Sequence, residues 1–317
     1  MKLITQKQAV AYTLDEIKSN MYSKHTGLVT RWGILNQAFS GGIKFGLIYT
    51  IGGPSGSGKS FVMNMIRWDM VNLNKDCQYK YKIINFVFEM PITAELVRSC
   101  SYVYKKSFKD LMSSNEKLDS KFYQNIVDTQ DLLIDDINYY CEESSTLEDV
   151  NRVIEGMHDK FPDHKFIITM DHSLLLELDR QNGITDDLSM VSATYKYAIH
   201  WKKKFKDTVI ILSQCNSSVE SAERRSADNP HLHYLTKSDL YSNKSSFHDS
   251  DYVLLFNKPS SYNLETYGPN RYPTKDLIAC HLIKDRLYGN SGMIRFRQDF
   301  ANGNLIYPYD QNTTNNS

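Results

Sequence analysis

A stretch rich in glycine and serine follows one apolar run and precedes another. It reads Gly53-Pro54-Ser55-Gly56-Ser57-Gly58-Lys59-Ser60, after the strand-like run Phe45–Ile51 and before the helix-like segment Phe61–Trp68. These residues match the phosphate-binding pattern G-x-x-x-x-G-K-[ST] in the strand–loop–helix context that it requires. The glycines let successive backbone N–H groups point at phosphate oxygens, and the helix N-terminus adds partial positive charge. We therefore expect Lys59 to reach the β- and γ-phosphates of a nucleoside triphosphate and Ser60 to offer its hydroxyl to Mg²⁺.

Three later strand candidates end in residues that suit nucleotide hydrolysis, and ligands of parallel sheets lie beyond the carboxyl ends of the strands. Glu89 follows one strand and could orient or deprotonate the attacking water. Asp171 ends another and could hold Mg²⁺ through its water shell. Gln214 ends a third and could sense the γ-phosphate. Taken singly, Glu89 is better explained as a surface carboxylate and Gln214 as a hydrogen-bonding residue at a strand end, and Asp171 has a solvated turn residue as its alternative.

Short apolar or β-branched runs alternate with helical stretches after the loop, which predicts an α/β fold with a parallel sheet flanked by helices. The expected strands are Tyr81–Phe88, Leu132–Asp135, Lys165–Met170 and Thr208–Ser213, and the expected helices are Thr93–Tyr104, Leu147–Lys160 and Ser189–Phe205. The last third instead predicts strands joined by turns at Asp251–Phe256, Asp276–Ile283 and Gly292–Arg297, with a hairpin turn at Leu287–Gly292. A short helix is expected within 12–22, with Thr13 as its cap.

The composition is that of an ordinary globular protein, with 317 residues, 41% hydrophobic and 23% charged. Lys+Arg and Asp+Glu both number 37, so net charge indicates no partner and any nucleic-acid surface must come from local clustering or assembly. Five scattered cysteines without a C-x-x-C pair predict free thiols rather than a zinc site or disulfides. No signal peptide and no apolar run of membrane-spanning length is present, so we expect a cytoplasmic protein of a bacterium or a phage-infected host.

The order of these motifs resembles the ATPase domain of DnaB-type replicative helicases, within the RecA-like group, over about residues 25–306. The opening signature is carried by Thr26, Gly27, Thr30, Leu35, Asn36, Gly41, Gly42 and Gly46. The later matches are Glu89-Met90, the sensor strand Ser213–Asn216, the loop around Ser238–Leu240 and the hairpin His281–Gly292. The resemblance implies a RecA-like ATPase domain over 25–308, preceded by a segment 1–24 with a linker helix that packs on a neighbouring subunit. A disordered tail over 309–317 completes the predicted organisation.

Under this resemblance Glu89 is the water-activating base, Asp171 the Walker B acid and Gln214 the sensor, with Lys59 and Ser60 on phosphates and Mg²⁺. Lys284 and Arg286 would reach in trans into the site of the next subunit. A phosphate-neutralising finger supplied in trans couples hydrolysis to closure of the subunit interface. The alternative for this pair is an exposed hairpin with solvated charges.

The resemblance implies an ATP- and Mg²⁺-dependent helicase that forms a ring, expected to be a hexamer, around single-stranded DNA, with primase or a loader as further partners. Loops at 174–187 and 224–248 would line its channel. The DNA-contact candidates are Lys237, Tyr241, Lys244, Arg224 and Arg225. The basic run Lys202–Lys206 is explained by a solvated helix end, with DNA contact as the alternative.

The chain departs from the family pattern at Asn36 and Ser60, where Asp and Thr are usual, at His172-Ser173 after Asp171, and at Tyr241, where Arg is typical. No room is left for the helical domain that precedes the ATPase domain in full-length replicative helicases. Two other functions therefore stay open: a RecA-like recombination or annealing ATPase, and a regulator or loader that binds nucleotide without hydrolysing it. The presence of Glu89, Lys284 and Arg286 together disfavours the non-hydrolysing regulator.

Overall fold

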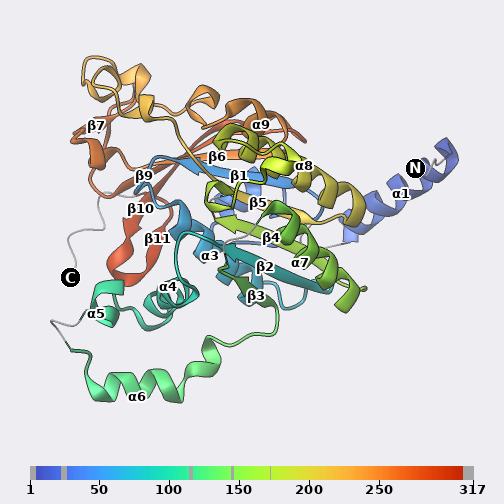
Figure 1. Ribbon diagram of the computed structural model, residues 1–317. Coiled ribbons are helices and arrows are strands. Elements are labelled where there is room, and N and C mark those ends of the chain that lie inside the picture. The colour runs from blue at the N-terminus through green and yellow to red at the C-terminus, as the bar shows by residue number, and fades with distance from the viewer. Residues whose placement is uncertain (1–4, 23–26, 114–116, 144–145, 172, 310–317) are drawn as a thin grey trace.

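The central element is a mixed sheet, whose strands are labelled in Figure 1. The computed structural model describes residues 5–22, 27–113, 117–143, 146–171 and 173–309. Within them, nine strands pair in the order β11-β10-β9-β6-β1-β5-β4-β2-β3. Their bounds are β1 Ile48–Gly53, β2 Tyr81–Val87, β3 Asn138–Cys141, β4 Lys165–Asp171, β5 Thr208–Gln214, β6 Tyr252–Asn257, β9 Leu277–Asp285, β10 Gly292–Asp299 and β11 Asn304–Ile306. The two-residue strands β7 (Thr266–Tyr267) and β8 (Tyr272–Pro273) form a separate ribbon.

Strands β1 to β6 run parallel to their neighbours, and β9, β10 and β11 continue the sheet antiparallel from β6. β1 is buried along its whole length between β5 and β6, as its apolar composition requires. The predicted α/β class, with a mostly parallel sheet and a C-terminal antiparallel hairpin, is confirmed.

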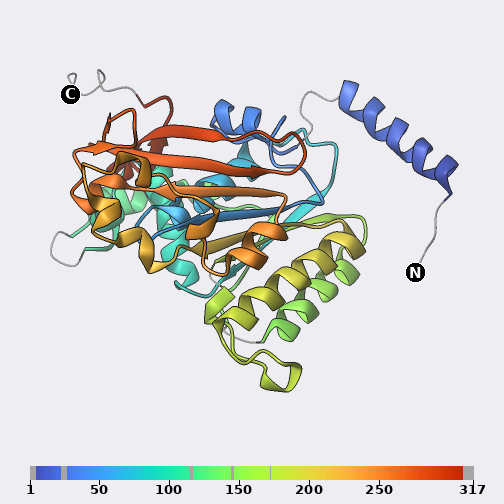
Figure 2. The same cartoon turned by 90° about the horizontal axis from the view of Figure 1, so that it is seen from above.

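Helices cover both faces of the sheet. Their bounds are α1 Gln6–Tyr22, α2 Gly33–Ala38, α3 Lys59–Asn72, α4 Ile92–Tyr104, α5 Phe108–Met112, α6 Ser120–Asp128, α7 Leu147–Lys160, α8 Asp187–Phe205 and α9 Asn243–His248. One core cluster joins α2 and α3 to one face, and another joins α7 and α8 to the opposite face. Figure 2 shows α7 and α8 side by side beneath the strands.

Local sequence explains where these helices begin and what they bury. In α7, Thr146 and Asp149 form a reciprocal capping box, and Val150 and Ile154 lie on the buried face. In α8, Asp186 caps the N-terminus, and three lysines occupy the last turn, where positive charge favours the helix dipole. Two of those lysines are also bonded: Lys202 to Asp251 and Lys204 to Glu155.

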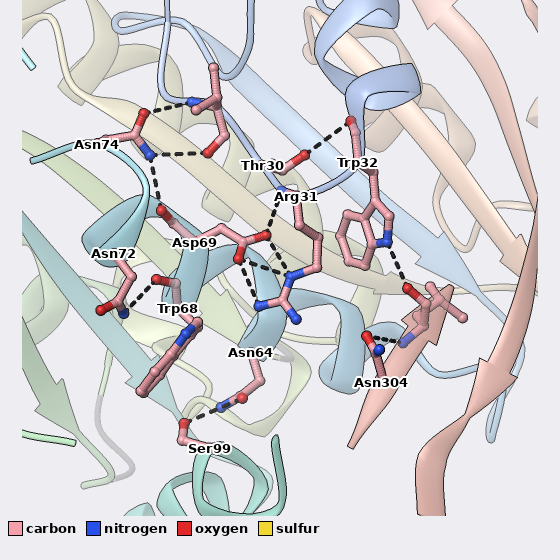
Figure 3. A network of polar contacts seen from close by, with 12 residues as sticks. Thr30, Arg31, Trp32, Asn64, Trp68, Asp69, Asn72, Asn74, Ser99 and Asn304 are labelled. Carbon is pink, nitrogen blue, oxygen red and sulfur yellow. Dashed lines mark hydrogen bonds and ion pairs between the residues drawn. The ribbon is translucent and has the colours of Figure 1, made fainter. Parts of the chain in front are cut away.

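The segment before β1 forms hydrogen bonds and an ion pair with α3 and its surroundings, and Figure 3 draws these contacts. Arg31 forms an ion pair with Asp69 at 2.7 Å, and Asn74 accepts from and donates to the backbone of Val29. The indole N–H of Trp32 donates to the carbonyl of Leu305 on β11 at 2.8 Å. These bonds hold the segment before β1 against α3, against Asn74 just after that helix and against β11.

Helix α1 stands apart from the rest of the molecule in both views (Figures 1 and 2). It begins at Gln6, earlier than expected, so Thr13 lies inside it and bonds back to the carbonyl of Ala9 rather than capping it. Tyr12, Leu14 and Met21 are more than half exposed. No helix in the described ranges has the length and apolarity needed to cross a membrane.

One predicted strand is wrong. Leu132 closes a short 3-10 turn, and Leu132 and Ile134 are 58% and 66% exposed, so this apolar run does not enter the sheet. The carboxylate of Asp135 accepts from the backbone N–H groups of Ile137 and Asn138, which makes a turn from which β3 starts. The strand therefore lies a few residues later, at Asn138–Cys141. The stretch that precedes it carries α5 and α6, which apolar patterning did not predict.

The other predicted elements are found with small shifts of their ends. All five cysteines are unpaired, as expected. Three sequence features lie outside the described residues: Thr26 of the opening signature, His172 after Asp171, and the part of the predicted tail over 310–317.

Candidate functional site

The predicted phosphate loop connects β1 to α3. Gly53 ends the strand at a point where an added Cβ would collide with the carbonyl of Phe256, and Gly58 takes a left-handed φ of 91° just before the helix. A side chain at either position would be strained or blocked. Ser57 lies in the loop with its hydroxyl buried and without a hydrogen-bond partner among the described residues. The loop is therefore held open by its glycines and retains one unsatisfied polar group.

Lys59 is the first residue of α3 and bends back over the loop. Its ammonium donates to the carbonyls of Gly53 and Pro54, each at 2.8 Å. Burial lowers the pKa of Lys59, and the nearby Cys215, Asp171 and Glu89 oppose that effect. The pKa of Lys59 is thus influenced by Asp171 and Glu89, the two carboxylates that the sequence assigns to the site.

Asp171 ends β4 and is 4% exposed. Burial raises the pKa of Asp171, which the positive charge of Arg67 opposes and the negative charge of Glu89 reinforces. The nearby Ser60 hydroxyl favours the ionised form of this carboxylate and so acts to lower the pKa of Asp171. The structure therefore brings together the two oxygen-bearing side chains that the sequence assigns to Mg²⁺.

Glu89 lies on the turn between β2 and α4, and its side chain is exposed. Val87, two residues earlier, is in register with Asp171 on the adjacent strand, so both carboxylates lie at the same edge of the sheet. This proximity explains why the charge of Glu89 acts on both Asp171 and Lys59.

Gln214 ends β5 directly beside Gly53, its partner in the strand register. Its backbone carbonyl accepts from the N–H of Tyr241 at 2.9 Å, and the next residue, Cys215, pairs with Leu240. The strand end is thus bonded to the loop that runs through 224–248. A displacement of Gln214 would therefore displace the backbone of that loop at Tyr241.

Lys284 and Arg286 lie at the opposite end of the sheet. Arg286 N–H donates to the carbonyl of Asp251, and Asp251 N–H donates to the carbonyl of Ile48, the first residue of β1. The five residue steps from Ile48 to Gly53 span roughly 17 Å at 3.3 Å per residue. The two cations therefore lie far from the phosphate loop of their own chain.

The predicted DNA contacts divide into two kinds. Lys237 and Lys244 are exposed, whereas Tyr241 is half-buried, and burial together with the charge of Asp187 at the start of α8 raises its pKa. Arg224 pairs with Asp239 and donates to two backbone carbonyls of its own loop.

The neighbouring Arg225 is also engaged, in an ion pair with Glu220 at 3.0 Å and over the ring of Tyr262. The structure thus gives both arginines bonds within the protein. Their assignment to DNA stays a prediction.

Sequence reasoning missed a network of charged side chains beneath the two carboxylates. Arg67 on α3 pairs with Glu95 on α4, and Glu95 also pairs with Arg98. The three-residue spacing of Glu95 and Arg98 on a helix was a readable signal, but nothing local connects Glu95 to Arg67, 28 positions earlier.

A family model described as the DnaB-like helicase C terminal domain matches residues 27–301. The chain belongs to this family. Among solved structures, an ATPase domain matches with a TM-score of 0.78 and 15% identity over 96% of this chain and 99% of that one. A DnaB-like replicative helicase, described with its interactions with primase, matches with a TM-score of 0.75 and 15% identity. That match covers 96% of this chain and 67% of the other.

No curated protein matches this chain. At 15% identity the solved structures establish the fold of this DnaB-like domain, and the family model establishes its membership. The predicted resemblance to DnaB-type helicases is confirmed. The family match spans the phosphate loop, both carboxylates, the Gln214 strand and the Lys284–Arg286 hairpin.

Proposed function

We propose that this chain is an ATP-dependent replicative DNA helicase that assembles into a ring, as a hexamer, and moves on single-stranded DNA. The observation that carries the proposal is the division of the hydrolytic residues between the two ends of one sheet. Lys59, Glu89 and Asp171 gather at the end that carries the phosphate loop, and Lys284 and Arg286 lie at the other.

The residues around the loop fit a nucleotide with Mg²⁺. The buried Ser57 hydroxyl lacks a hydrogen-bond partner among the described residues, and Gly53 lets the loop pass so close to the carbonyl of Phe256 that no side chain would fit there. Ser60 and Asp171 supply the hard oxygen atoms that Mg²⁺ prefers. Bound there, the ion would neutralise charge on the phosphates and orient the terminal one.

Within this chain, Lys59 would exchange its two carbonyl acceptors for phosphate oxygens. Glu89 would orient the attacking water and take its proton. Gln214 would contact the terminal phosphate and pass its presence to the loop at Tyr241 through the backbone bond between them.

Lys284 and Arg286 cannot serve the phosphate loop of their own chain across the length of β1. In a head-to-tail ring, the same surface of one subunit can meet the phosphate loop of the next. Hydrolysis would then occur only at closed interfaces, where the arginine stabilises charge on the transferred phosphoryl group.

The test is ATP hydrolysis with and without single-stranded DNA, combined with particle imaging of the nucleotide-bound assembly. We expect DNA-stimulated turnover, closed rings and unwinding of a forked duplex. Glu89→Gln should lower kcat by about 10²–10⁴-fold, because the water loses its base. Unchanged turnover in that variant would overturn the assignment of Glu89.

Two other outcomes would favour different functions. Open filaments with strand exchange would indicate a recombination ATPase. Nucleotide binding without turnover by the unmodified chain would indicate a regulator or loader.

A further inference from the structure

Arg67 and Glu95 form an ion pair that is almost completely buried. The guanidinium Nη1 and carboxylate Oε2 lie 3.0 Å apart, and the side chains are 3% and 1% exposed. The second carboxylate oxygen, Oε1, accepts from Arg98 at 2.5 Å. Burying charges is costly even when they are paired, so a buried triad of this kind is weak evidence of a purely stabilising role.

Both ends of this triad reach the residues that flank the catalytic carboxylates. Arg98 Nη2 lies 2.8 Å from the sulfur of Met90, which directly follows Glu89. Arg67 Nε donates at 3.1 Å to the hydroxyl of Thr169, two residues before Asp171 on β4. The positive charges of both arginines also favour the ionised carboxylate of Asp171.

Further hydrogen bonds join α3 and α4 beside this triad. Asn64 on α3 donates to the backbone carbonyl of Glu95 at 3.2 Å. The hydroxyl of Ser99 on α4 donates to the side-chain oxygen of Asn64, a bond drawn in Figure 3. Because α3 begins at Lys59, the packing of α3 against α4 sets how far the phosphate loop lies from the turn that carries Glu89.

We propose that Arg67, Glu95 and Arg98 are positioning residues that hold the Glu89 turn at a fixed distance from the phosphate-loop helix. This inference rests on the proposed function, because it assumes that Glu89 activates water. Glu95 is the centre of this network, because its two carboxylate oxygens pair with the two arginines. Arg98 holds the turn through Met90, and Arg67 ties the pair to α3 and β4.

A small displacement of a catalytic group costs rate without costing affinity, because substrate binding depends on other contacts. Loss of the network should therefore lower kcat and leave KM for ATP nearly unchanged. A purely structural role would instead lower thermal stability and the active fraction, with no preference for this site.

The same helix offers a matched control. Arg31 and Asp69 form another pair with one fully buried member, at 15% and 2% exposure, and it faces the segment before β1 rather than the carboxylates (Figure 3). Asp69→Asn removes a buried charge from α3, as Glu95→Gln does from α4, without touching the Glu89 turn.

The experiment measures ATPase kinetics at saturating single-stranded DNA for the unmodified chain, Glu95→Gln, Arg98→Met and Asp69→Asn, together with thermal unfolding. We expect kcat to fall tenfold or more in the first two variants, with KM for ATP within twofold. Arg98→Met leaves the buried Arg67–Glu95 pair intact, so it stays informative if Glu95→Gln folds poorly. Asp69→Asn should keep its kcat whatever its melting temperature.

The proposal is overturned if Arg98→Met and Glu95→Gln retain kcat within twofold. It is equally overturned if Asp69→Asn loses as much kcat as they do, because the effect would then follow stability alone. Absence of hydrolysis by the unmodified chain would instead overturn the proposed function, and this inference with it.

Discussion

Lys284 and Arg286 donate to the same acceptor, the backbone carbonyl of His248 at the end of α9. Lys284 also donates to the carbonyl of Phe247 at 2.5 Å, and Arg286 pairs with Asp251 at 3.2 Å. Free carbonyls at a helix C-terminus carry partial negative charge and attract cations. The two cations are thus held as one unit on the segment 224–248, so a movement of that segment would displace both together.

We expect ATP hydrolysis to slow at alkaline pH because Lys284 loses its positive charge there. Burial and the neighbouring Arg286 lower the pKa of Lys284 to about 8. The amine therefore loses its charge as pH rises through that value, and a neutral amine cannot neutralise a phosphoryl group. We expect DNA-stimulated ATPase activity to fall above pH 8, measured as kcat across the alkaline range.

Lys284→Arg is the control for that limit, because a guanidinium stays charged at every pH at which the protein is folded. The variant should keep its activity through the range in which the unmodified chain loses it. An identical decline in both proteins would assign the limit to another group.

Mixing two inactive variants tests whether the cations act between subunits. Glu89→Gln subunits retain Lys284 and Arg286, and Arg286→Ala subunits retain Glu89. If the site is shared, an equimolar mixed ring contains some interfaces with both groups, and activity should return to at most about a quarter of the unmodified level in a head-to-tail ring. The measurement is ATPase activity after co-assembly.

Separately assembled rings of each variant, combined without exchange, provide the background. Recovery that appears without subunit exchange, or no recovery after verified exchange, would contradict an action in trans.

Local signals in the sequence were enough to predict the strands and helices around the site. The phosphate loop, Glu89, Asp171 and Gln214 each follow a buried apolar run, and burial of such runs in one sheet brings their ends together. The failed strand at 132–135 has the same apolar character, but only the folded chain shows that this stretch stays outside the sheet. Apolar runs therefore locate strands only where the rest of the chain supplies a face to cover them.

Long-range charge pairing was beyond sequence reasoning. Arg67 and Glu95 are 28 positions apart, and Arg31 and Asp69 are 38 apart, with no periodicity joining either pair. Arg224 illustrates the same limit, because its charge suggested DNA contact while the fold engages it with Asp239. Such pairs depend on how helices and loops pack, which no short window of residues encodes.

Arg224 and Arg225 should differ in their effect on stability despite being adjacent. Arg224 pairs with the buried Asp239, and its side chain is 17% exposed. Removing one member of a buried pair leaves the other charge without compensation, so Arg224→Gln should lower the free energy of unfolding by roughly 2–3 kcal/mol. Arg225→Gln breaks a pair whose members are 35% and 48% exposed, and should cost less than about 1 kcal/mol. Denaturant unfolding of both variants checks this order, and equal losses would contradict it.

Lys237 and Lys244 are the exposed cations of the predicted DNA-facing segment, and neither is drawn into an ion pair among the described residues. If each lysine neutralises one phosphate, its loss should reduce the slope of log K against log salt by about 0.7 for single-stranded DNA. We therefore expect Lys237→Ala and Lys244→Ala to weaken DNA binding at low salt and to make it less sensitive to salt.

Fluorescence anisotropy with labelled oligonucleotides of several sequences measures this slope. Weakening should be similar for all sequences, because contacts to phosphate carry no base information. A variant that weakens binding without changing the slope would mean that its lysine acts through the fold of the loop rather than through the DNA backbone.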